Sequence, residues 1–116
     1  MTLLDYGCGV GNGFFPLIEQ YGLDNLRVNC CDISKTAVGI IKQHPLYQEQ
    51  KIDARQCDLV NDEIPFEPNT ADFGIFIFVL SAISPEKYSS VLKKLSEQMK
   101  VGGVVYFRDY GRFDMA

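Results

Sequence analysis

No hydrophobic run in the 116-residue sequence approaches the roughly 20 residues of a membrane-spanning helix, so we expect no membrane segment. Met1 is followed almost at once by a predicted strand, which leaves no room for a signal or transit peptide. The expected compartment is therefore the cytoplasm, with the nucleus as an alternative. The length predicts a single domain, residues 1–116, with one core.

Basic clusters and metal-ligand spacings are also missing. The formal net charge is −4 and Lys93-Lys94 is the only doublet of basic residues, so the chain shows no electrostatic footprint for nucleic acid. The cysteines form no C-x-x-C pair and have no histidine at zinc spacing, which argues against a metal site. We expect four buried, reduced thiols: Cys8, Cys30, Cys31 and Cys57.

Two familiar nucleotide-binding patterns are absent from the glycine-rich stretch 7–13. Dinucleotide-binding sites need G-x-G-x-x-G, but Asn12 and Phe14 stand where the third glycine would have to be. A P-loop needs a lysine that is not there. The remaining pattern is G-x-G-x-G after an apolar run that contains Asp5, which suits S-adenosylmethionine because that cofactor has no phosphates to hold. The alternative is a glycine-rich turn between a strand and a helix.

Strand and helix patterns alternate along the chain, which is typical of a parallel α/β sheet. The predicted strands cover residues 2–6, 27–31, 52–57, 72–78 and 104–107. The predicted helices cover 13–21, 34–44 with Ser34 as N-cap, and 84–102 with Ser84-Pro85 at its start and Gly102-Gly103 at its end. Their inward faces are predicted to carry Phe14, Leu17, Ile18 and Tyr21; Ala37, Ile40 and Ile41; and Tyr88, Val91, Leu92, Leu95 and Met99.

Right-handed crossovers predict the sheet order 3-2-1-4-5, with a ligand at the carboxyl ends of strands one, two and four. Asp32 ends the second strand, where a carboxylate can accept both ribose hydroxyls, although such acids also cap helices. Asp58 ends the third strand and is a candidate acceptor for an adenine amino group, with a turn cap as its alternative. Leu59 and Ile77 are the candidate flanks of the adenine ring.

Several segments spread along the chain follow the pattern of one known family. They are GCGVGN (7–12), FPL (15–17), CD (31–32), HPLY (44–47), CDL (57–59), FVLSA (78–82) and FRDYGRFD (107–114). The chain resembles the class I, S-adenosylmethionine-dependent methyltransferases. More narrowly, segments 79–82 and 108–111 resemble the methyltransferase-like enzymes that make 3-methylcytidine in the anticodon loop of tRNA.

The resemblance implies a Rossmann-like class I methyltransferase core. The chain begins inside the first predicted strand and ends just after the fifth, so we expect a central fragment that lacks the family's C-terminal strands and leaves strand five as an exposed apolar edge. It also implies a set of cofactor contacts: Asp5, Gly7, Gly9, Gly11, Asn12, Asp32, Ile33, Asp58, Leu59 and Ile77.

The implied reaction is methyl transfer from S-adenosylmethionine to N3 of cytidine. In this hypothesis Asp109 accepts a proton from the cytosine amino group, Tyr110 stacks on the base, and Arg108 pairs with Asp109 or contacts a phosphate. The alternative is that Arg108 and Asp109 form an ion pair that caps strand five. Expected partners are tRNA, bound through the full-length protein, and a protein such as a synthetase or second subunit.

Two competing functions stay open. One is a catalytically silent module that binds cofactor or stabilises a partner, and the other is a methyltransferase for a small molecule or protein. His44, the single histidine, is interpreted as a residue that ends a helix, since it directly precedes Pro45.

Overall fold

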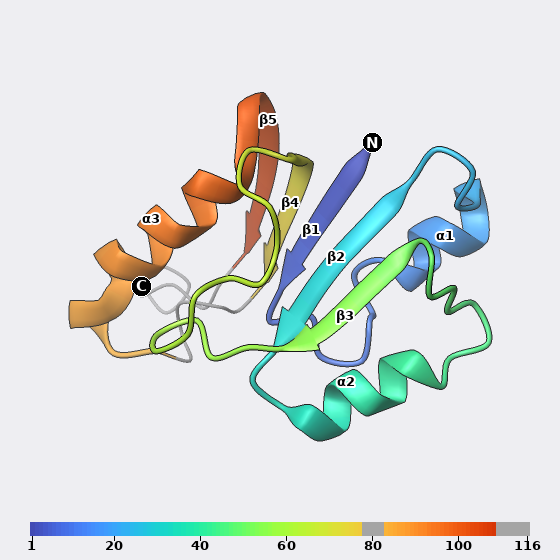
Figure 1. Cartoon of the computed structure of the whole chain (residues 1–116), viewed down its shortest axis with the longest axis horizontal. Helices are drawn as coiled ribbons and strands as arrows, with labels where there is room; N and C mark the ends of the chain where they lie inside the picture. The colour runs from blue at the N-terminus through green and yellow to red at the C-terminus, as the bar shows by residue number, and fades with distance from the viewer. Residues whose placement is uncertain (78–82, 109–116) are drawn as a thin grey trace, which may run out of the picture.

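The computed structural model describes residues 1–77 and 83–108, which form a five-stranded sheet with helices on both faces (Figure 1). The elements are, in chain order, β1 (Thr2–Tyr6), α1 (Phe15–Tyr21), β2 (Arg27–Asp32), α2 (Lys35–Lys42), β3 (Ile52–Gln56), β4 (Ala71–Ile77), the 3-10 helix η2 (Pro85–Lys87), α3 (Tyr88–Gln98) and β5 (Met99–Arg108). The strand order is β3-β2-β1-β4-β5 and all pairs are parallel, which confirms the predicted order.

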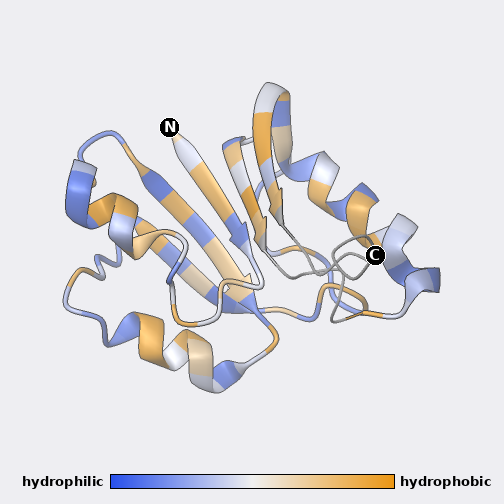
Figure 2. Ribbon diagram, turned by 180° about the vertical axis from the view of Figure 1, so that it is seen from behind, coloured by the Kyte–Doolittle hydropathy of each residue, from blue (hydrophilic) through white to orange (hydrophobic). Residues whose placement is uncertain are grey.

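The sheet separates two cores, because successive side chains of a strand point to opposite faces. The α1-side core packs strand residues such as Leu3 and Val28 against α1 and α2. The α3-side core packs Leu4 and Tyr6 against Val91 of α3. Figure 1 shows α1 and α2 at the β3 end of the molecule and α3 at the β5 end, and Figure 2 shows hydrophobic colour alternating with hydrophilic colour along α2 and α3.

Helix α1 begins at Phe15, two residues later than predicted, and its N-cap makes no side-chain hydrogen bond. The prediction that Leu17 and Tyr21 face inward is wrong, since their side chains are 37% and 74% exposed. Phe15 is buried in their place, together with Ile18. A helix that starts at Phe15 turns this pair toward the sheet, because residues three apart share a helix face.

Helix α2 confirms the predicted cap, since the Ser34 hydroxyl accepts a hydrogen bond from the Ala37 N–H at 3.1 Å. It ends at Lys42 rather than at residue 44. Val38 and Ile41 are its buried residues, whereas Ile40, which was predicted to face inward, is 48% exposed.

The prediction for the last helix is confirmed at its start and wrong at its end. Ser84 is the N-cap residue of η2 and Pro85 is its first residue, although the Ser84 side chain makes no cap hydrogen bond, and η2 runs directly into α3. Helix α3 ends at Gln98 instead of at the glycine pair. The predicted inward residue Leu92 is 43% exposed. Gly102 and Gly103 lie inside β5, where the pairing with β4 shifts register. A Cβ on Gly103 would lie 3.0 Å from the Lys100 carbonyl oxygen, so these glycines allow a strand irregularity rather than end a helix.

Strand β5 lies at the edge of the sheet and exposes hydrophobic side chains, as predicted. Four of its hydrophobic residues are each about half exposed: Val104, Val105, Tyr106 and Phe107.

No helix within residues 1–77 and 83–108 combines the length and hydrophobicity needed to cross a membrane. All four cysteines are buried and free, as predicted.

Candidate cofactor site

The chain turns sharply where β1 ends, in the loop of residues 7–13, here called the glycine loop. Gly7, Gly9 and Gly11 all have positive φ angles, of 65°, 55° and 93°. The loop is tied to its surroundings by the Cys8 N–H, which donates to the Cys31 carbonyl at 3.1 Å. The Gly11 N–H donates to the Cys8 carbonyl at 3.0 Å. Glycine is needed here because other residues rarely adopt these φ angles.

A side chain would have different consequences at Gly9 and at Gly11. A Cβ on Gly9 would have no atom within 4 Å, so the backbone at Gly9 faces open space that a ligand can enter. A Cβ on Gly11 would overlap the Phe15 ring, at 2.5 Å from Cε2. Gly9 therefore lets a ligand approach the loop backbone, whereas Gly11 lets the loop pack closely on Phe15 of α1.

Asp32 joins the glycine loop to the start of α2. Its Oδ2 accepts a hydrogen bond from the Gly9 N–H at 2.8 Å, and its Oδ1 accepts one from the Ser34 N–H at 2.9 Å. The structure therefore shows the alternative role predicted for Asp32, in which its carboxylate accepts hydrogen bonds from backbone N–H groups at the start of a helix. Each carboxylate oxygen can accept a further hydrogen bond, so the predicted contact with ribose hydroxyls stays compatible with this geometry.

Asp5 is the most deeply buried carboxyl group at the site, with 3% of its surface exposed. It lies on β1, beside Cys30 of β2 and Ile75 of β4. Its Oδ2 would be 3.0 Å from a Cβ on Gly13, so the carboxyl group lies directly under the glycine loop. Burial, and then the negative charge of Asp32, raises the pKa of Asp5 to about 7.

We expect Asp5 to make the protein less stable as the pH rises. Because its pKa is higher in the folded state than in the unfolded state, the folded state binds the extra proton between the two values. From pH 5 to pH 7 this loss amounts to about 2 kcal/mol of unfolding free energy. Urea denaturation of the wild type and of Asp5→Asn at both pH values measures it. Asp5→Asn should lose most of that slope, and equal slopes would contradict the assignment.

Asp58 caps a turn in the structure. Its Oδ1 accepts a hydrogen bond from the Val60 N–H at 2.9 Å, and its Oδ2 accepts one from the Asn61 side-chain amide at 2.8 Å. These hydrogen bonds, that of Asn61 first, lower the pKa of Asp58. The turn-cap alternative is thus what the structure shows, and the adenine contact stays a prediction.

Lys94 of α3 holds this turn in place, a role that sequence reasoning missed. Its Nζ donates to the carbonyl oxygens of Leu59 at 3.0 Å, Val60 at 3.2 Å and Asp62 at 2.8 Å. Leu59 is half-buried against the α3-side core. A lysine in a basic doublet on a helix reads as solvent-exposed, so the sequence carries no signal for these contacts.

The other predicted site residues are placed only in part. Asn12 is exposed in the glycine loop, and Ile33 is 63% exposed just after β2. Ile77 ends β4 and Arg108 ends β5, but their side chains are not among the described parts of the structure. The remaining predicted catalytic residues, Asp109 and Tyr110, lie outside the described residues.

A parallel sheet whose strand order reverses between β1 and β4, with a glycine loop after β1 and an acid at the end of β2, defines a doubly wound nucleotide-binding class of domain. A match to a protein family narrows this class further. Residues 3–103 match the family described as methyltransferase domain, and the chain belongs to that family.

Curated relatives match almost the whole chain. The tRNA N(3)-cytidine methyltransferase METTL2 of Gallus gallus is 44% identical over an aligned length of 116, which covers 98% of this chain and 31% of that protein. The tRNA N(3)-cytidine methyltransferase METTL6 of Rattus norvegicus is 45% identical over an aligned length of 118, which covers 100% of this chain and 40% of that protein. The chain thus spans 31–40% of the length of these relatives.

Solved structures confirm the Rossmann-like fold. A Pyrococcus horikoshii protein, PH0226, superposes with a TM-score of 0.71 at 30% identity and covers 91% of this chain and 48% of its own. The DhpI–SAH complex superposes with a TM-score of 0.72 at 19% identity and covers 97% of this chain and 50% of its own. At that identity the second likeness shows the fold alone.

Proposed function

We propose that this domain binds S-adenosylmethionine and serves methyl transfer to N3 of cytidine in the anticodon loop of tRNA. The observation that carries the cofactor assignment is the pairing of Asp32 with the Gly9 amide beside open space. The substrate assignment is supported by the relatives METTL2 and METTL6, which are tRNA N(3)-cytidine methyltransferases and align with nearly every residue of the chain.

The described residues fit this cofactor. The backbone at Gly9 is open where a Cβ would otherwise stand, which lets a ligand approach the loop closely. Asp32 has acceptor capacity left for ribose hydroxyls after its two backbone hydrogen bonds. When bound, S-adenosylmethionine supplies an electrophilic methyl group. Asp5 places a further carboxyl group under the loop, with a pKa of about 7.

Arg108, at the end of β5, and the two residues that follow it are assigned to the target base. Asp109 accepts the proton of the cytosine amino group, and Tyr110 stacks on the ring. Arg108 pairs with Asp109 or contacts a phosphate. The ring nitrogen N3 already has an available lone pair at neutral pH, so these residues position the base more than they activate it.

Calorimetry and nucleoside analysis test the two parts separately. We expect the chain to bind S-adenosylhomocysteine saturably and not NAD. Because the chain spans only 31–40% of the length of these relatives, the methylation assay with tRNA and S-adenosylmethionine uses a longer protein that contains it, and mass spectrometry should then detect 3-methylcytidine. The variant Asp109→Asn should keep cofactor binding and lose the methylated nucleoside.

Each possible failure points to a different part. A folded chain that does not bind S-adenosylhomocysteine would remove the cofactor assignment. Binding without 3-methylcytidine from the longer protein would remove the tRNA assignment and favour a silent binding module. Full activity of Asp109→Asn would remove the role given to Asp109.

A further inference from the structure

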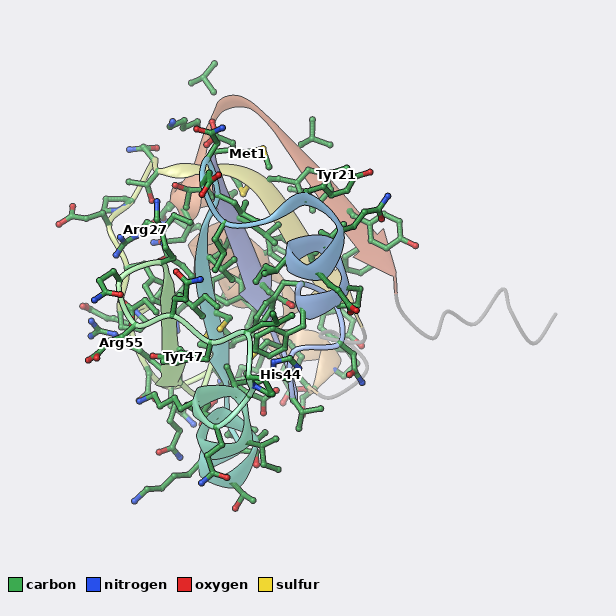
Figure 3. All side chains as sticks on the ribbon, turned by 90° about the vertical axis from the view of Figure 1, so that its right-hand side faces the viewer. Met1, Tyr21, Arg27, His44, Tyr47 and Arg55 are labelled. Atoms are coloured by element: carbon green, nitrogen blue, oxygen red, sulfur yellow. The ribbon has the colours of Figure 1, made fainter. Side chains whose placement is uncertain are left out.

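Two stacked aromatic rings, those of Phe15 and His44, pack against the glycine loop at Gly11. The Phe15 ring lies so close to Gly11 that a Cβ would overlap it. The same ring stacks on the imidazole of His44, with centroids 3.7 Å apart and planes inclined by 10°. Phe15 is 5% exposed, so it has little room to move. Figure 3 shows His44 in the region between the ribbons of α1 and α2.

The backbone after α2 fixes the position of His44. Its Nδ1 accepts a hydrogen bond from the Leu46 N–H at 3.0 Å, and its carbonyl accepts one from the Tyr47 N–H at 2.9 Å. Its own N–H donates to the Ile41 carbonyl at 3.1 Å. A neutral imidazole that accepts at Nδ1 carries its proton on Nε2. The ring therefore has a fixed plane against which Phe15 can stack.

These contacts run without a break to the cofactor site. The Phe15 N–H donates to the Gly11 carbonyl at 2.9 Å, and the Gly11 N–H donates to the Cys8 carbonyl at 3.0 Å. Gly9 directly follows Cys8, and its N–H donates a hydrogen bond to the Asp32 carboxylate. A shift of the Phe15 ring would thus change the turn at Gly11 and the direction of the Gly9 amide.

We propose that His44 is a positioning residue for the glycine loop, and that its flat ring, acting through Phe15, sets the loop geometry that binds the cofactor. This inference rests on the proposed function and assigns a role to His44 within the HPLY segment, residues 44–47. An aliphatic side chain would fill the same volume, but it would not present a plane parallel to the Phe15 ring. Precise placement of binding groups depends on such supporting contacts.

Two substitutions of His44 separate the ring from the volume it fills. His44→Leu removes the flat ring together with both of its nitrogens, whereas His44→Phe keeps an aromatic plane and loses only the nitrogens. The matched control is Leu46→Ala, which truncates a side chain partly buried against the same α1-side core but keeps the backbone N–H that donates to His44 Nδ1. Calorimetric titration with S-adenosylhomocysteine gives the Kd of each variant, and urea denaturation gives its stability.

We expect His44→Leu to weaken binding about tenfold, which corresponds to about 1.4 kcal/mol. His44→Phe should stay within about twofold of the wild type by the same measure. Leu46→Ala should lower the unfolding free energy while leaving Kd unchanged, since a merely structural role does not alter affinity in the folded protein. An unchanged Kd in His44→Leu, or an equal loss in Leu46→Ala, would overturn the inference.

Amide hydrogen exchange, followed by NMR without ligand, tests the same contact independently of the proposed function. His44→Leu should speed exchange at the Gly11 amide relative to His44→Phe and Leu46→Ala. If no variant binds S-adenosylhomocysteine, the cofactor assignment fails while this exchange pattern still decides the role of His44. Equal exchange rates in all three variants would overturn that role.

Discussion

Gly11→Ala should destabilise the protein by about 2–5 kcal/mol and abolish measurable cofactor binding. The new Cβ would overlap the Phe15 ring, which is buried and stacked on His44 and so cannot move aside. Overpacking of this kind costs roughly 1–3 kcal/mol. The φ angle of 93° adds about 1–2 kcal/mol for any residue with a side chain. Urea denaturation measures the first loss and calorimetry the second.

Two other glycines serve as controls for Gly11→Ala. Gly9→Ala has a positive φ but no atom near the added Cβ, so it should cost only about 1–2 kcal/mol of stability. It should nonetheless weaken S-adenosylhomocysteine binding, because the Cβ occupies the open space beside the loop. Gly39→Ala, within α2 and also without close atoms, should stabilise the protein by about 0.4–1 kcal/mol. Comparable stabilities for Gly11→Ala and Gly9→Ala would contradict the packing argument.

Asp32→Ala should weaken S-adenosylhomocysteine binding by about 100-fold or more and lower stability by about 3 kcal/mol. The change leaves the Gly9 and Ser34 amides without their acceptor, and hydrogen bonds to charged groups contribute roughly 1.5–3 kcal/mol each. The ligand also loses the proposed ribose acceptor. Removal of this charge should lower the pKa of Asp5, since Asp32 is the second cause of its rise.

Asp32→Asn and Ser34→Ala separate the two roles of Asp32. The amide oxygen of Asn can accept from one backbone N–H, so Asp32→Asn should keep part of the stability and lose most of the affinity. Ser34→Ala removes the α2 cap, which should cost about 1 kcal/mol of stability without a change in Kd. Wild-type affinity in Asp32→Ala would contradict the cofactor site proposed here.

The fold followed closely from the sequence because its determinants are local. The mainly apolar segments that end at Tyr6, Asp32 and Ile77 form parallel strands. The Ser34 cap begins α2, as predicted. The errors concern helix faces and glycines. Gly102-Gly103 has the composition of a helix end, but its closeness to β4 makes it an irregularity in β5.

At the site, the sequence by itself determined which residue types stand at the ends of the strands: the glycines after β1, Asp32 at the end of β2 and Asp58 after β3. Spacing along the chain suffices for this, because parallel strands bring their carboxyl ends to one edge of the sheet. Only the tertiary structure decided what supports them. Lys94 reaches the turn after β3, and His44 stacks on Phe15 behind Gly11. Such contacts join residues far apart in the chain, and no local pattern encodes their distance or orientation.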